Sequence, residues 1–184
     1  TLLDVMEHNH PQPESLHGRS FAPLLKGEPQ TGREFVILQY NENAGRNRHP
    51  MRGIQTRQYL YLYNPWSDGN RQFATATIGT MTYRQMVNRA KSEPEVAARL
   101  DLFDHRVLEE FYDVEHDPDC LNNLIDDPQI QSKLEQLRSQ LVKSLQEMND
   151  PVAPLLADLD NQQLREEYML QEDAYGKKAK KRKR

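Results

Sequence analysis

The sequence predicts an α+β fold in which a small antiparallel sheet packs against a long amphipathic helix near the C-terminus. Short apolar segments bounded by turn-forming residues predict the strands. One of them, residues 58–63, alternates tyrosines with leucines, as expected of a half-buried strand. A later segment carries apolar residues at helical spacing. The chain of 184 residues has room for one ordinary domain, or for a small domain with extensions.

The first part of the chain reads as loops and short helices. Residues 1–30 combine a helical piece, a loop rich in His and Pro, and a second helical piece that we expect to end at Gly27. The chain begins with Thr1 rather than Met, inside a helix-like segment, so we expect that this is not a natural N-terminus.

Four strands are predicted. They cover residues 35–40, 51–56, 58–63 and 110–114. The second and third are expected to form a hairpin, because only Arg57 separates them. Residues 41–50 are polar and rich in turn formers, which predicts a loop between the first two strands.

Helices are predicted in two regions. Residues 82–99 favour two short helices with a break at Glu93-Pro94. A long helix follows, with Asp127 as its cap and Pro128 at its first position. We expect its apolar stripe to pack on the sheet, and the stripe consists of Ile130, Leu134, Leu137, Leu141, Leu145 and Met148.

The composition predicts a modest core and a solvated extension. Hydrophobic residues make up 36% and charged residues 28% of the chain, and the mean hydropathy is −0.90. Residues 151–184 become acidic and then basic. They could form a weak helix lined by Leu164, Tyr168 and Tyr175, but we expect a disordered extension.

The charge is unevenly distributed. Residues 177–184 carry seven of the 24 basic residues, which leaves residues 1–176 with 17 basic and 28 acidic residues, a net charge of −11. A body of this sign argues against a nucleic-acid groove on its surface. No apolar run approaches the ~20 residues needed to cross a bilayer, so no membrane partner is expected.

Neither a metal site nor a catalytic residue is predicted in this chain. The six histidines lack metal-ligand spacing, and the acidic turn from Asp113 to Asp119 lacks the central Gly and terminal Glu of a calcium loop. Cys120 has no flanking His or Lys that would favour its thiolate.

Several segments occur in the order found in the final third of the sulfatase family, which the chain resembles over roughly residues 1–150. They are residues 1–4 (TLLD), 16–27 (LHGRSFAPLLKG), 52–59 (RGIQTRQY) and 110–114 (EFYDV), with the later Asp117-Pro118 and Asn122-Asn123-Leu124. Residues 83–90 and 147–151 look most like sulfamidases, the N-sulfoglucosamine sulfohydrolases.

The resemblance implies a domain organisation. Residues 1–30 would end the catalytic domain of an alkaline-phosphatase-like sulfatase fold, and residues 31–150 would form its C-terminal subdomain. The missing N-terminal catalytic domain would supply calcium and a formylglycine made from cysteine in a Cys-x-Pro-Ser-Arg motif. Cys120 is followed by Leu121 and cannot be that residue. The chain alone is therefore predicted to be inactive.

The resemblance also implies a substrate and a location. The full-length enzyme would hydrolyse sulfuric esters or sulfamates of sulfated sugars, with N-sulfoglucosamine of heparan-type glycosaminoglycans as the expected substrate. A periplasmic or secreted location is expected.

Residues 41–52 are where this subdomain is expected to reach the substrate, because a polar loop on a rigid sheet can overhang an active site. Arg52, His49 and Glu42 are the predicted substrate-binding residues. Arg52 offers a planar donor fork suited to a carboxylate or sulfate. The alternative is that Arg52 pairs with an acidic neighbour, and that Glu42 and His49 are structural.

Two rival functions remain open on the sequence. The chain could be a non-catalytic interaction protein whose basic tail binds an anionic polymer or nucleic acid. It could also be a decayed sulfatase.

Overall fold

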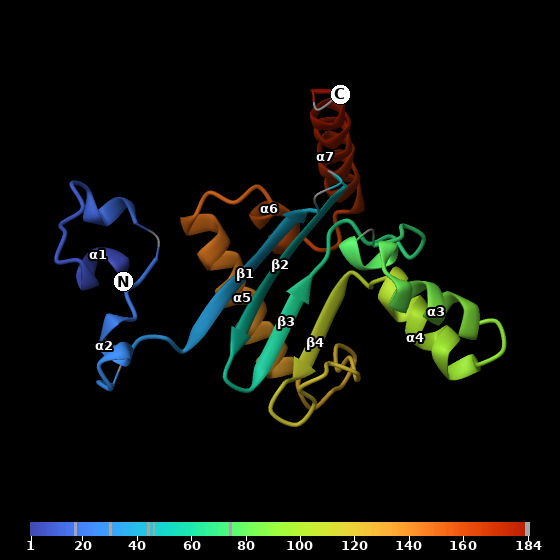
Figure 1. Cartoon of the computed structure of the whole chain (residues 1–184), viewed down its shortest axis with the longest axis horizontal. Coiled ribbons are helices and arrows are strands. Elements are labelled where there is room, and N and C mark those ends of the chain that lie inside the picture. Colours follow the sequence, from blue (N-terminus) through green and yellow to red (C-terminus); the bar gives the residue numbers. More distant parts are fainter. Residues whose placement is uncertain (17, 30, 44, 46, 74, 183–184) are drawn as a thin grey trace. The chain divides into compact units, whose positions relative to one another are not determined.

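The computed structural model describes residues 1–16, 18–29, 31–43, 45, 47–73 and 75–182 and divides the chain into two compact units, Thr1–Glu34 and Phe35–Arg184 (Figure 1). Several residues of predicted segments lie outside the described residues: His17, Gln30, Ala44, Arg46, Lys183 and Arg184. The division falls four residues after the boundary expected at residue 30, and residues 151–182 belong to the second unit.

The first unit contains only short helices among its described residues. They are α1 (Leu2–Val5), the 3-10 helix η1 (Pro13–Ser15) and α2 (Ala22–Leu25). Gly27 has a φ of 75°, a conformation that glycine adopts without strain, and its amide donates to the carbonyl of Leu24. The predicted helix end at this glycine is confirmed.

The second unit is built on a four-stranded antiparallel sheet in the order β1-β2-β3-β4. Its strands are β1 (Phe35–Glu42), β2 (Arg48–Thr56), β3 (Tyr59–Tyr63) and β4 (Glu109–Asp113). All four predicted strands and the predicted hairpin are therefore confirmed. The loop expected over residues 41–50 is wrong in extent, because Glu42 pairs with Arg48 across the two strands and their side chains form an ion pair.

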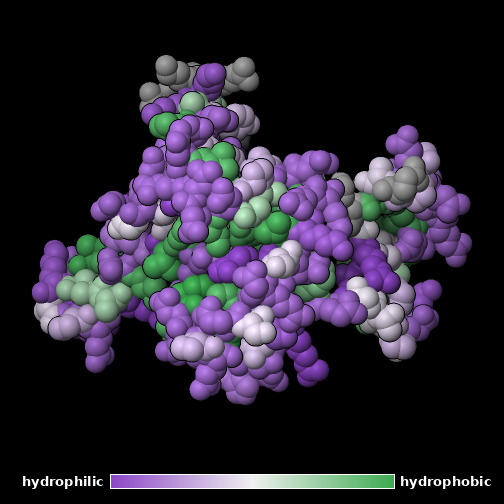
Figure 2. Space-filling view, turned by 180° about the vertical axis from the view of Figure 1, so that it is seen from behind, coloured by the Kyte–Doolittle hydropathy of each residue, from purple (hydrophilic) through white to green (hydrophobic). Residues whose placement is uncertain are grey.

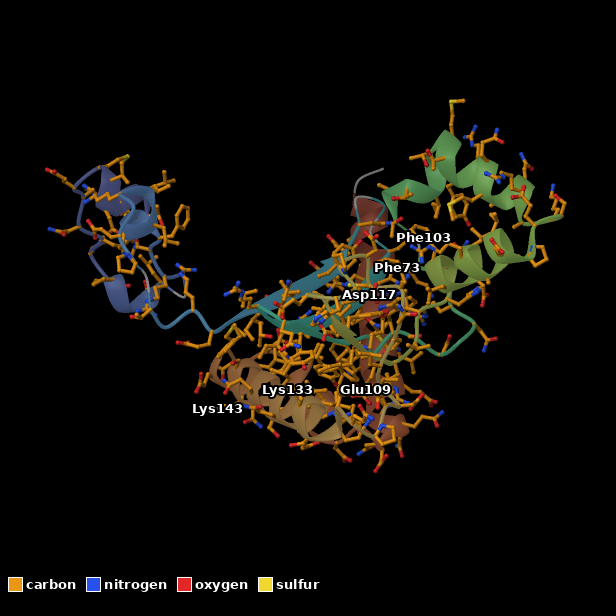
Figure 3. The ribbon with its side chains drawn as sticks, turned by 90° about the horizontal axis from the view of Figure 1, so that it is seen from below. Phe73, Phe103, Glu109, Asp117, Lys133 and Lys143 are labelled. Carbon is orange, nitrogen blue, oxygen red and sulfur yellow. The ribbon has the colours of Figure 1, made fainter. Side chains whose placement is uncertain are left out.

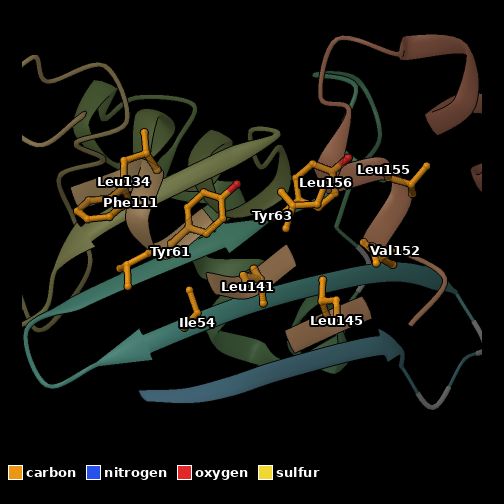
Figure 4. Close-up of a cluster of buried hydrophobic side chains, with 12 residues drawn as sticks. Ile54, Tyr61, Tyr63, Phe111, Leu134, Leu141, Leu145, Val152, Leu155 and Leu156 are labelled. Carbon is orange, nitrogen blue, oxygen red and sulfur yellow. The ribbon is translucent and has the colours of Figure 1, made fainter. Parts of the chain in front are cut away.

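Helix α5 (Gln131–Glu147) covers one face of the sheet, as predicted, and the shared core lies between them (Figure 4). Its predicted start at Pro128 is three residues early, because the Asp127 carboxylate accepts from the Gln129 amide and holds a separate turn. The core contains residues from the sheet and from the helix: Ile54, Tyr61, Tyr63, Phe111, Leu134, Leu137, Leu141 and Leu145.

A helical pair follows β3. The 3-10 helix η2 (Ala76–Gly79) leads into α3 (Met81–Arg89) and α4 (Pro94–Asp104), with Pro94 at the first position of α4. The two short helices and their break are confirmed.

The C-terminal segment is helical where we expected disorder. Helices α6 (Ala153–Ala157) and α7 (Gln162–Arg182) occupy most of it. Val152, Leu155 and Leu156 join the core at 0%, 3% and 2% exposure. The apolar surface that they bury offsets the conformational entropy lost when this stretch becomes ordered. The sequence left open a weak helix or a disordered extension for this segment, and the structure shows a helix as far as Arg182. None of the described helices is long and apolar enough to cross a membrane.

Candidate functional site

The three predicted substrate-binding residues all lie on the β1–β2 hairpin. Glu42 ends β1, whereas His49 and Arg52 belong to β2. Because successive side chains of a strand point to opposite faces, positions 49 and 52 face opposite sides of the sheet. Arg52 shares the α5 side with Ile54, while His49 packs against the segment that follows β3. The structure therefore does not bring their side chains into one site.

Arg52 is the centre of a buried polar cluster. Its side chain is 3% exposed, and its Nε donates to the Asp150 carboxylate at 2.7 Å. One terminal nitrogen donates to the side-chain oxygen of Asn41 at 2.9 Å and to two backbone carbonyls of the hairpin. Gln39 donates to the same carboxylate at 3.1 Å. The alternative that Arg52 pairs with an acidic neighbour is thus confirmed, and the neighbour follows α5.

Glu42 belongs to a second cluster, which connects the hairpin to α7. The Arg48 guanidinium contacts Glu42 at 3.3 Å, and its Nε donates to Glu172 of α7 at 2.6 Å. The same guanidinium lies 5.1 Å from the ring centre of Tyr175. Arg48 thereby connects the start of β2 to both the end of β1 and α7.

His49 is buried in an aromatic pocket. Its ring lies 4.8 Å from Trp66 and 5.4 Å from Phe73, both edge-on, and its Nε2 is 3.2 Å from the carbonyl of Gln72. Phe73 is labelled in Figure 3 beside the helices α3 and α4. Burial lowers the pKa of His49, and the hydrogen bond to Gln72 opposes that effect. The imidazole is therefore kept neutral at ordinary pH, which does not favour direct binding of an anion.

A buried carboxylate without a cationic partner in the described structure lies next to this pocket, and the sequence reasoning missed it. Asp104 accepts from the Tyr83 hydroxyl at 2.9 and 3.1 Å and from the Gln72 amide at 3.0 Å. This contact fixes the α3–α4 pair to the segment that holds His49. No local signal marks it, because Tyr83 and Asp104 are 21 residues apart.

Glu110 forms another polar cluster that spacing did not reveal. The carboxylate is 1% exposed and accepts from Asn64 at 2.6 Å, from Tyr112 at 2.6 Å and from Arg106 at 3.0 Å. Burial, with the neighbouring carboxylate, raises the pKa of Tyr112. Each of these charges is neutralised or hydrogen-bonded, so the cluster supports structure rather than chemistry.

An open cavity of about 440 Å³ lies between the turn after β3 and α7. Two guanidinium groups and three carboxylates are among its lining groups, so the local charge does not favour a sulfate. Its charged lining residues are Asp68, Arg71, Arg165, Glu166 and Asp173.

No metal or nucleophile site is evident in the described part of the chain. No group of three His, Cys, Asp or Glu side chains there is arranged to hold a metal ion, so these residues do not fit the calcium that the family resemblance implies. Cys120 is half-buried, and burial raises the pKa of its thiol, which disfavours the reactive thiolate.

Comparison with curated proteins finds a related sequence. The chain is 30% identical over 138 residues to human N-sulphoglucosamine sulphohydrolase. The aligned region covers 74% of this chain and 27% of that protein. The chain thus spans about a quarter of the length of this relative. No protein-family model matches the chain.

Comparison with solved structures gives the fold. A 2-O GAG sulfatase matches with a TM-score of 0.51 and 21% identity, over 82% of this chain and 24% of that one. A protein in complex with its substrate D-glucosamine-2-N,6-O-disulfate also matches with a TM-score of 0.51, at 17% identity, over 82% of this chain and 23% of that one.

Proposed function

The chain is related to the sulfatases in sequence and fold, and from this premise we propose that it forms the C-terminal region of an enzyme that hydrolyses sulfated sugars. The observation that carries the proposal is the 30% identity over 138 residues to a sulphohydrolase, within a fold that sulfatase structures share. The finer part of the proposal is that the reacting group is an N-sulfate on glucosamine of heparan type. The name of the human relative supports the N-sulfate. The structural neighbour in complex with D-glucosamine-2-N,6-O-disulfate supports a sulfated glucosamine, because that sugar carries both an N-sulfate and an O-sulfate.

The role of this chain in that enzyme is to support the fold and contact the substrate. We assign the substrate side to the tip of the β1–β2 hairpin, where Glu42 lies. Arg52 and His49 would serve the same site by holding the hairpin, because both side chains are buried and engaged. A direct contact of Arg52 with a sulfate would require its guanidinium to exchange Asp150 for the substrate.

The chemistry itself would come from outside this chain. A separate catalytic domain would supply the formylglycine nucleophile and calcium, and we propose a periplasmic or secreted location for the complete enzyme. These elements rest on the family relationship.

The test compares the isolated chain with the longer protein that would contain it. Each is supplied with calcium and given glucosamine carrying either an N-sulfate or a 6-O-sulfate, and released sulfate is measured by ion chromatography. We expect no turnover by the isolated chain, and release from the N-sulfated sugar by the longer protein. Turnover by the isolated chain would refute the assigned role, and preference for the O-sulfate would refute the sulfamidase assignment.

A further inference from the structure

Helix α7 separates its charges along its length. Before Gly176 it carries the acidic residues Glu166, Glu167, Glu172 and Asp173, with a single basic residue, Arg165. From Lys177 to the end, the chain carries seven basic residues and no acidic one. This order matches the helix dipole, which favours acidic groups near the N-terminus and basic groups near the C-terminus.

Two carboxylates of the acidic half are used to anchor the helix. Glu172 contacts Arg48 of β2, and Asp173 receives both terminal nitrogens of Arg71 at 3.0 Å. Met169, at 6% exposure, adds an apolar contact. Because these carboxylates are paired with the body, they are less available to neutralise the lysines that follow.

The basic end extends beyond this anchor. Figure 1 shows the last turns of α7 pointing away from the sheet, and Figure 2 shows that this projecting part is mostly hydrophilic. Lys177 and Lys178 are exposed, and among the described residues neither forms an ion pair with a carboxylate. The body behind them has a net charge of −11 over residues 1–176. By net charge, this end attracts an anionic polymer more strongly than the body does.

We propose that the basic end of α7 binds a sulfated polysaccharide and so keeps the polymer next to the enzyme that hydrolyses it. The choice of a sulfated polymer rests on the proposed function. A nucleic acid is less suited to this surface, because residues 176–184 contain no aromatic side chain that could stack on a base. Tyr175, the last aromatic residue, is already in contact with Arg48.

Binding is measured on the full chain by fluorescence anisotropy with a labelled heparin oligosaccharide over a series of salt concentrations. The variant replaces Lys177 and Lys178 with Gln. The matched control replaces Lys133 and Lys143 of α5, labelled in Figure 3, and changes the net charge equally. We expect the slope of log affinity against log salt to fall by about two in the variant. Affinity should fall about two- to thirty-fold, while the control binds like the wild type.

Two further probes test the class of partner. A heparin backbone without sulfates should not bind, and single-stranded DNA of equal charge should bind more weakly than heparin. DNA binding as tight as heparin binding would overturn the choice of partner. If the control variant loses as much affinity for heparin, or if the wild type does not bind heparin, the basic end of α7 is not the binding site. Salt-sensitive dimers that sedimentation detects only with Lys177 and Lys178 present would instead assign this end to the acidic body of a second copy.

The outcome is separable from that of the proposed function. The Lys177→Gln, Lys178→Gln variant of the longer protein should hydrolyse a sulfated monosaccharide like the wild type, since neither lysine belongs to the substrate side that we assign to the hairpin. A longer protein without any sulfatase activity would refute the proposed function, even if its tail binds heparin.

Discussion

Arg52 donates to the carboxylate of Asp150 at 2.7 Å, and this ion pair joins β2 to the end of α5 across 98 residues of sequence. Their side chains are 3% and 7% exposed. Gln39 and the amide of Val152 donate to the same carboxylate, so both of its oxygens are engaged. A buried pair with this many hydrogen bonds fixes the position of the hairpin relative to the helices.

Replacing Arg52 should therefore destabilise the fold. Arg52→Met leaves Asp150 buried without its cation, and breaking a buried pair in this way costs about 3–5 kcal/mol. Urea titrations measure this loss as a decrease in the free energy of unfolding. Arg89→Met is the matched control, because its pair with Glu93 is exposed and should matter little. Equal urea midpoints for the two variants would contradict a structural role for the Arg52 pair.

The packing of α5 on the sheet predicts a large cavity effect. Leu141 is fully buried, so Leu141→Ala should lower the free energy of unfolding by about 2–5 kcal/mol. Lys143→Ala, on the exposed side of the same helix, should leave it nearly unchanged. An unchanged melting curve for Leu141→Ala would show that the helix is not docked in solution.

Burial of His49 predicts a loss of stability on acidification. Its pKa is lowered in the folded state, so between that value and the ordinary value of about 6.5 the unfolded chain takes up a proton that the folded chain does not. Stability is complete above the ordinary value and falls as the pH drops towards the lowered one. Arg71 favours the neutral ring, and Asp173 opposes this effect.

The measurement compares urea midpoints at about pH 7.5 and about pH 5.5. His49→Gln should show a smaller decrease than the wild type, whereas the exposed His116→Gln should retain the full decrease. An identical decrease in His49→Gln and the wild type would assign the pH dependence to other groups.

The ion pairs of α7 predict a local effect on its dynamics. Glu172→Gln removes the charge that Arg48 contacts, so the amides of α7 should exchange about two- to five-fold faster with deuterium. Glu167→Gln changes an exposed carboxylate on the same helix, which accepts a hydrogen bond from Gln163, and should not alter exchange. Equal protection in both variants would mean that Arg48 does not hold the helix.

In the longer protein, the position of Arg52 in the β1–β2 hairpin predicts that its replacement affects catalysis. Arg52→Ala should lower kcat/KM for the N-sulfated sugar by about ten- to a hundred-fold, whether Arg52 contacts the sugar or positions the tip. Formylglycine content, measured by mass spectrometry, should not change. Unimpaired kcat/KM would confine this residue to stability.

The sequence predicted the elements whose signals are local. The tyrosine–leucine alternation around Tyr61 located a strand, and the stripe through Leu141 located α5 and the surface that it covers. Proline and glycine at Pro94 and Gly27 marked a helix start and a helix end. Each of these signals depends on neighbours a few residues away.

The polar contacts that the sequence did not predict join residues that are far apart in the chain. Nothing near Arg52 in the sequence identifies Asp150 as its partner, and nothing near Tyr83 points to Asp104. For the C-terminal segment, the polar average composition favoured disorder over the alternative of a helix, whereas Val152 and a few neighbours bury apolar surface in the core. Charge content predicts disorder only when such contacts are lacking.

The two edges of the sheet differ in a way that limits self-assembly. On the outer side of β4, the backbone of Phe111 is capped, since its amide donates to the Asn123 side chain and its carbonyl accepts from the Leu124 amide. Among the described residues of the second unit, no backbone partner lies on the outer side of β1, whose eight residues include a single charge, Glu42. An uncapped strand with few charges is a template for strand addition. Of the two edge strands described in the second unit, β1 is the one open to such addition, so pairing through β1 would join two chains and would not by itself extend into a fibre.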